Sequence, residues 1–144
     1  MGEHITMKEL LYILIGLKQY IKQYHWLVKG YDNHILADKL GEGLEDEIDE
    51  LVELTITASG NENDFIAQEL LNRAGQGLNG AYIGLDAKET LKTIADLCVK
   101  ILNQCKALQG NYKDMTELAF SDYFGRLSNS ILRKLYLIQV QIYK

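Results

Sequence analysis

The complete absence of proline is the feature that most restricts how this chain can fold. Proline interrupts a helix because it lacks a backbone donor and clashes with the preceding turn. The 144 residues are punctuated by glycine and asparagine instead, and no segment shows the alternation of apolar and polar residues that is typical of a half-buried strand. The sequence therefore predicts an all-α fold.

Apolar residues recur at helical spacing over four long segments, and glycine or asparagine stands near their ends. The predicted helices cover residues 7–28, 33–58, 87–108 and 113–143. We expect Asp32 or Asn33 to cap the second helix, because both side chains accept hydrogen bonds from a first helical turn. A weaker helical segment, 64–74, and a glycine-rich stretch, 75–84, would form one long connection between the second and third helices. The length suits one domain, residues 1–144, folded as a helical bundle.

The composition limits the partners and the location of the chain. The net charge is −5 and no basic cluster is longer than Arg133-Lys134, so nucleic acid is not expected as a direct partner. The longest apolar run, residues 10–17, is far shorter than the roughly 20 residues that span a membrane, and no cleavage site for a secretion signal follows it. Cys98 and Cys105 would lie about 10 Å apart on one helix, too far for a disulfide. We therefore expect two free thiols and a cytoplasmic location.

Histidine and carboxylate side chains are concentrated between residues 25 and 53. The stretch HWLVKGYDNHILAD carries His25 and His34. In the second predicted helix, His34 and Asp38 lie one turn apart on one face, and so do Asp49 and Glu53. In an uninterrupted helix these four residues would form one continuous stripe. Such a stripe could bind a metal ion, or it could be a solvated acidic surface.

The distance between the two pairs indicates how they could share an ion. Their centres are 15 residues apart in the sequence, which is roughly 22 Å along a helix, whereas metal–ligand bonds are about 2 Å long. Two copies of the helix, packed antiparallel across a two-fold axis, would place each pair opposite the other, and His25 could complete each site. The axis would cross near Gly41 and Gly43, which would let the backbones approach closely, unless these glycines only mark a bend.

These residues resemble the motif of a known family. HWLVKG, followed by His34, Asp38, Asp49 and Glu53, is similar to the Dps-type mini-ferritins, whose motif reads HW-x-x-(K/R)-G and then H-x3-D-x10-D-x3-E. The match covers roughly residues 20–54, and the spacings from His34 onward are those of the family. The chain departs from the family in a shorter turn before His34, in the neighbours of Glu53, and in lacking a Gly-x-x-Pro pattern in the long connection.

The resemblance implies a ferritin-like four-helix bundle with a long connection between its second and third helices. Mini-ferritins form hollow dodecamers built from two-fold dimers. They bind Fe²⁺ at sites shared between subunits, oxidise it with hydrogen peroxide or oxygen, and store the ferric product, which protects against oxidative stress. Carried over by position, His25, Asp49 and Glu53 would bind the tighter iron, and His34 and Asp38 would support a second iron or its water.

Alternatives stay open for the tryptophan, the metal and the class of function. Trp26 would lie beside the iron site as a catalytic residue that quenches oxidising equivalents, or it would be a core aromatic that anchors the first helix. The same ligands suit Zn²⁺ or Mn²⁺. The chain could also be a structural or scaffolding protein that keeps the oligomer interface without ferroxidase activity, because the shorter turn could displace His25.

Overall fold

The computed structural model describes residues 7–59, 67–77, 87–110 and 115–142. In chain order the elements are α1 (Met7–Leu27), α2 (Tyr31–Gly41), α3 (Leu44–Ser59), α4 (Ala67–Gly77), α5 (Ala87–Leu108) and α6 (Glu117–Ile142). All of these elements are helices, which confirms the predicted all-α class for the described part of the chain. None of the described helices is both long enough and apolar enough to cross a membrane.

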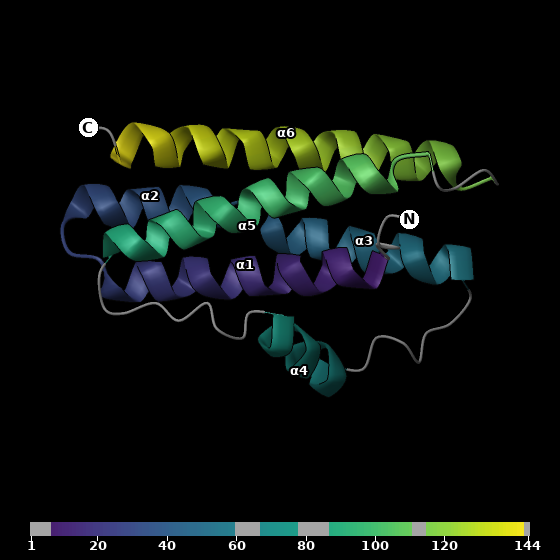
Figure 1. Cartoon of the computed structure of the whole chain (residues 1–144), viewed down its shortest axis with the longest axis horizontal. Helices are drawn as coiled ribbons and strands as arrows, with labels where there is room; N and C mark the ends of the chain where they lie inside the picture. The colour runs from purple at the N-terminus through teal and green to yellow at the C-terminus, as the bar shows by residue number, and fades with distance from the viewer. Residues whose placement is uncertain (1–6, 60–66, 78–86, 111–114, 143–144) are drawn as a thin grey trace.

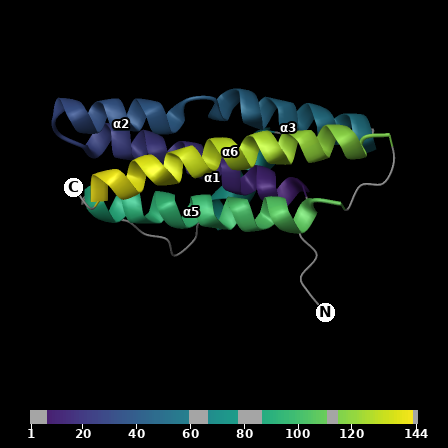
Figure 2. The same cartoon turned by 90° about the horizontal axis from the view of Figure 1, so that it is seen from above.

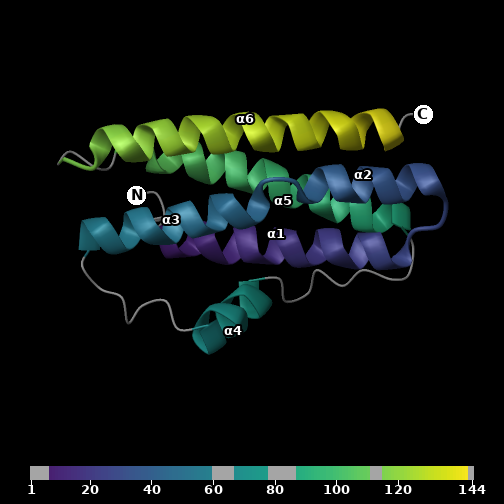
Figure 3. The same cartoon turned by 180° about the vertical axis from the view of Figure 1, so that it is seen from behind.

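The helices α1, α5 and α6 run side by side along the long axis, together with α2 and α3, which follow one another end to end (Figures 1 and 2). α1 contacts α2, α3 and α5, and α6 contacts the same three helices. These helices therefore surround one shared core. α4 contacts α1 and lies on its outer side, away from α6 (Figure 3).

The core follows from the helical spacing of apolar residues. In α1, Leu10, Leu14, Leu17 and Ile21 are three or four positions apart, and all four are buried. α5 and α6 complete the core with Leu91, Ile94, Ile101, Phe120, Phe124, Leu127, Ile131 and Ile138. Burying each large apolar side chain contributes about 1.5–3 kcal/mol. Both cysteines of α5 are buried and free, so the prediction of free thiols is confirmed.

The second predicted helix, residues 33–58, is in fact two helices, because the chain leaves the helical path between α2 and α3. Glu42 has φ −58° and ψ 131°, and Gly43 has a positive φ of 79°, which residues with a side chain rarely adopt. The carbonyl oxygen of Glu42 accepts a hydrogen bond of 2.8 Å from Nζ of Lys134 on α6. The prediction of one uninterrupted helix is therefore wrong, and so is the continuous stripe derived from it. Gly43 marks a bend.

The start of α2 also differs from the prediction. The helix begins at Tyr31 after Gly30, whose φ is 95°, and no side chain makes a hydrogen bond as its cap. Nδ2 of Asn33 donates instead to the carbonyl oxygen of Lys29 at 2.8 Å. The predicted cap by Asp32 or Asn33 is wrong, because the left-handed conformation of Gly30 makes the turn between α1 and α2.

Candidate functional site

The turn between α1 and α2 brings three of the predicted ligands together. His25 lies near the end of α1, and His34 and Asp38 lie on α2. The ring centroids of His25 and His34 are 5.1 Å apart, with the rings nearly perpendicular at 78°. Nδ1 of His25 is 3.6 Å from Oδ1 of Asp38. The shorter turn before His34 therefore leaves His25 beside the other two residues.

The side chains of this cluster are accessible to a ligand. The side chain of His25 is 42% exposed and that of Asp38 is 72% exposed. The 3.6 Å between Nδ1 of His25 and Oδ1 of Asp38 exceeds hydrogen-bonding distance, so the two side chains are not hydrogen-bonded to each other and both atoms could bind a ligand. Both residues line a groove of about 310 Å³ between α1 and the α2–α3 pair, which Trp26 also lines. Trp26 is 66% exposed, so the interpretation as a core anchor is wrong for this chain.

Asp49 and Glu53 lie apart from the cluster, one turn from each other on α3 and both exposed. Neighbouring acidic residues of α3 form ion pairs with other helices: Glu45 pairs with Lys18 of α1 at 3.1 Å, and Glu50 pairs with Arg126 of α6. Asp49 and Glu53 have no such partner within the described residues. In the same part of the chain, no group of three or more histidine, cysteine, aspartate or glutamate side chains could hold a metal ion, and this holds for His25, His34 and Asp38 as well. One chain therefore presents two separate sets of ligand-type side chains.

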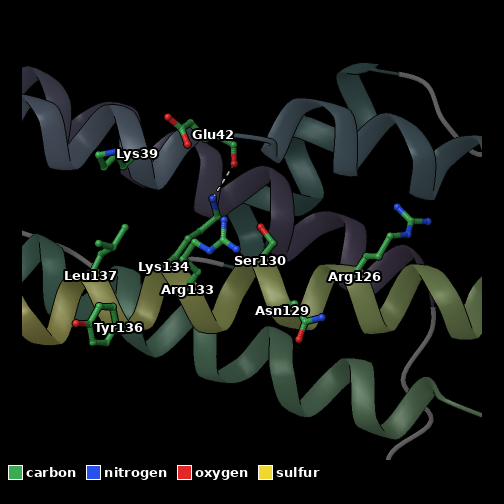
Figure 4. Close-up of a pocket in the computed structure, with 9 residues that line it drawn as sticks. All are labelled: Lys39, Glu42, Arg126, Asn129, Ser130, Arg133, Lys134, Tyr136 and Leu137. Atoms are coloured by element: carbon green, nitrogen blue, oxygen red, sulfur yellow. Dashed lines mark hydrogen bonds between the residues drawn. The ribbon is translucent and has the colours of Figure 1, made fainter.

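A second groove lies between the end of α2 and α6 (Figure 4). No site there was predicted from the sequence. It has a volume of about 530 Å³ and is lined by Lys39, Glu42, Arg126, Asn129, Ser130, Arg133, Lys134, Tyr136 and Leu137. Its basic residues come from distant parts of the sequence, and the Arg133-Lys134 doublet is the only local signal.

A pair of opposite charges, the buried Lys134 and the partly buried Glu47, lies beside this second groove. Lys134 is only 3% exposed, and burial lowers the pKa of its ammonium group, an effect that the negative charge of Glu47 opposes. Burial likewise raises the pKa of Glu47, against a hydrogen bond from Ser130 and the charge of Lys134. Oε2 of Glu47 is buried without a hydrogen-bond partner among the described residues. The hydroxyl of Tyr123 donates to the carbonyl oxygen of Glu47 at 2.6 Å, which ties α3 to α6.

Comparisons of the chain with protein-family models, with curated proteins and with solved structures find no match.

Proposed function

We propose that this chain is an iron-binding protein with a ferritin-like four-helix bundle. It oxidises Fe²⁺ with hydrogen peroxide or oxygen at sites shared between two copies of the chain, and it stores the ferric product in a hollow oligomer. The cluster of His25, His34 and Asp38 carries this proposal. Two imidazoles and a carboxylate from two helices lie together, partly exposed, beside an open groove.

Each copy of the chain supplies half of a site in this proposal. His25, His34 and Asp38 form one half, and Asp49 and Glu53 form the other. Helix rises about 1.5 Å per residue, so the two halves of one chain are too far apart to bind the same ion. In a two-fold dimer, the first half of one copy faces the second half of its partner, and two equivalent sites result.

The bend between α2 and α3 is compatible with such a dimer. Glu42 and Gly43 are exposed, and they lie at the point where the two-fold axis would cross. Each ligand pair stays within one helix, so the bend leaves His34 and Asp38 one turn apart, and the same holds for Asp49 and Glu53. A partner copy would approach over the exposed face of α2 and α3.

The ligand types suit the reaction. Imidazole and carboxylate groups bind Fe²⁺, and carboxylates favour the more highly charged Fe³⁺ product. Each Fe²⁺ loses one electron and hydrogen peroxide accepts two, so two Fe²⁺ ions are oxidised for each peroxide, which takes up two protons and becomes water. The exposed Trp26 lies beside the groove, where its indole can take up stray oxidising equivalents.

The test is an anaerobic titration of the metal-free protein with Fe²⁺, followed by peroxide addition and detection of Fe³⁺ by absorbance. We expect rapid oxidation by the wild type. The variant Asp49→Ala/Glu53→Ala should oxidise Fe²⁺ no faster than buffer. A matched control, Glu69→Ala/Asp96→Ala, removes one glutamate and one aspartate from exposed positions of α4 and α5 and should keep the wild-type rate.

Equal rates in the wild type and in the Asp49→Ala/Glu53→Ala variant would overturn the proposal. If the variant also assembles like the wild type, the scaffolding function becomes the better account. Repeating the anaerobic titration with Zn²⁺ or Mn²⁺ in place of Fe²⁺ shows whether the same ligands prefer another ion.

A further inference from the structure

The groove between α2 and α6 is distinct from the proposed iron site. It lies on the α6 side of α2, whereas the groove beside His25 lies on the α1 side, and the two grooves share no lining residue. In Figure 4, the side chains of Ser130, Arg133 and Lys134 rise from α6 towards the end of α2. A ligand in this groove would contact both helices at the bend.

The charges that line this groove differ in sign from the chain as a whole. Four cationic residues, Lys39, Arg126, Arg133 and Lys134, face a single carboxylate, Glu42, although the net charge of the chain is −5. Such a concentration of positive charge on an acidic protein attracts anions to one place.

Two of these cations are already neutralised by the fold. Arg126 forms ion pairs with Glu50 and, at 2.8 Å, with Asp122. The ammonium of Lys134 donates to the carbonyl oxygen of Glu42 and interacts favourably with Glu47.

The other two cations, Lys39 and Arg133, have no ion pair within the described residues. Both residues are exposed and line the groove, Lys39 from α2 and Arg133 from α6. The positive charge of Arg133 also acts unfavourably on the neighbouring ammonium of Lys134. An anion placed between the walls would relieve this repulsion and neutralise both exposed cations.

We propose that this groove binds a diphosphate group, either as free pyrophosphate or carried by a nucleoside. A guanidinium group binds phosphate oxygens in pairs and an ammonium group binds them as a point charge, so Arg133 and Lys39 are suited to adjacent phosphates. A carboxylate would offset only one of the two exposed cations, whereas a phosphate group carries up to about two negative charges and a diphosphate supplies one phosphate for each wall of the groove. The volume of about 530 Å³ lies within the usual range for small-molecule sites.

Isothermal titration calorimetry tests the proposal. The metal-free protein is titrated with sodium pyrophosphate, with ADP and with adenosine, in EDTA and about 150 mM salt, where long-range attraction between exposed charges is screened. We expect saturable binding of pyrophosphate and ADP, and none of adenosine. Equal affinities would indicate that the diphosphate alone is recognised, and tighter binding of ADP would indicate that the nucleoside contributes.

The matched variants are Lys39→Gln/Arg133→Gln in the groove and Arg73→Gln/Lys100→Gln outside it. Both double variants remove one lysine and one arginine charge from exposed positions, so both should fold, which circular dichroism would verify. We expect the groove variant to bind pyrophosphate at least about tenfold more weakly, because it loses two charge-assisted contacts. The control should bind like the wild type.

Three results would overturn the proposal: no saturable binding of pyrophosphate or ADP, equal weakening in both double variants, or binding of a single-stranded oligonucleotide alone. None of these results depends on iron oxidation, so they leave the proposed function at the other groove unaffected.

Discussion

The buried ammonium group of Lys134 stabilises the bend between α2 and α3, and the substitution Lys134→Met tests this role. Methionine keeps most of the length of the side chain and removes its charge. The residue is 3% exposed, and its Nζ makes a 2.8 Å hydrogen bond to the carbonyl oxygen of Glu42. The variant leaves this oxygen without its donor and Glu47 without its neighbouring positive charge.

The expected loss of stability follows from these two interactions. A hydrogen bond from a charged group contributes about 1.5–3 kcal/mol, and relief of the cost of burying the ammonium offsets part of this amount. We therefore expect the free energy of unfolding to fall by about 2 kcal/mol at pH 8. Burial raises the pKa of the Glu47 carboxyl above the 4.5 that it has in the unfolded chain. Protonation of Glu47 therefore stabilises the folded protein fully below pH 4.5, and this stabilisation is lost as the pH rises through the pKa of the folded state. Removing Lys134 raises the pKa of Glu47 in the folded state further. More of Glu47 is then protonated and uncharged at pH 5, so the loss of stability in the variant should be smaller at pH 5 than at pH 8.

Urea unfolding followed by circular dichroism, at one fixed protein concentration, measures this loss at pH 5 and pH 8. The matched control is Lys100→Met, at an exposed position of α5, which should change stability little. In a Glu47→Gln background the loss caused by Lys134→Met should be smaller, because no buried carboxylate is left without its cation. An unchanged stability at both values of pH, or an equal loss with and without Glu47, would refute the reasoning.

Three further predictions concern other parts of the fold. Tyr123→Phe removes the hydrogen bond to the carbonyl oxygen of Glu47 and should lower the unfolding free energy by about 1 kcal/mol in urea unfolding; a wild-type value would contradict this. Gly43→Ala should cost about 1–2 kcal/mol because of its positive φ, whereas Gly41→Ala, in a regular helix with ordinary contacts, should be neutral or stabilising; thermal denaturation compares the two. Burial raises the pKa of Cys98 to about 12, so iodoacetamide should alkylate this thiol in the folded protein far more slowly than in urea, and equal rates would be inconsistent with the core.

The positions of the helices could be predicted from the sequence because apolar periodicity and glycine punctuation are local signals. The spacing of Leu10, Leu14 and Leu17 indicates the buried face of α1 without knowledge of its neighbours. The predicted end of the third helix, residue 108, agrees with the end of α5 at Leu108. The local signal is Gly110, which follows the helix with a positive φ of 85°.

The bend at Gly43 could not be predicted with the same certainty, because it depends on residues far away in the chain. Its surroundings carry good helix formers, and a glycine alone does not decide between a bend and a close approach of helices. The bend is completed by Lys134, which donates to the carbonyl oxygen of Glu42 across the bundle.

The candidate sites show the same limit. The sequence supplied the types of ligand at His25, His34 and Asp38, and the contact between them needed the geometry of the turn at Gly30. The groove between α2 and α6 joins Lys39 to Arg133, and no local pattern connects two residues so far apart in the sequence. The opposition of two half-sites across a dimer stays a prediction.

Subunit complementation tests that central claim most directly. One variant, His34→Ala/Asp38→Ala, loses the first half-site, and the other, Asp49→Ala/Glu53→Ala, loses the second. The two are co-expressed with different tags, and the mixed assembly is isolated by purification on both tags. If each site is shared across a two-fold axis, half of the randomly formed dimers are mixed and each of these contains one intact site, so Fe²⁺ oxidation should recover to about a quarter of the wild-type rate. A mixed assembly that oxidises Fe²⁺ no faster than either parent variant would contradict the shared site.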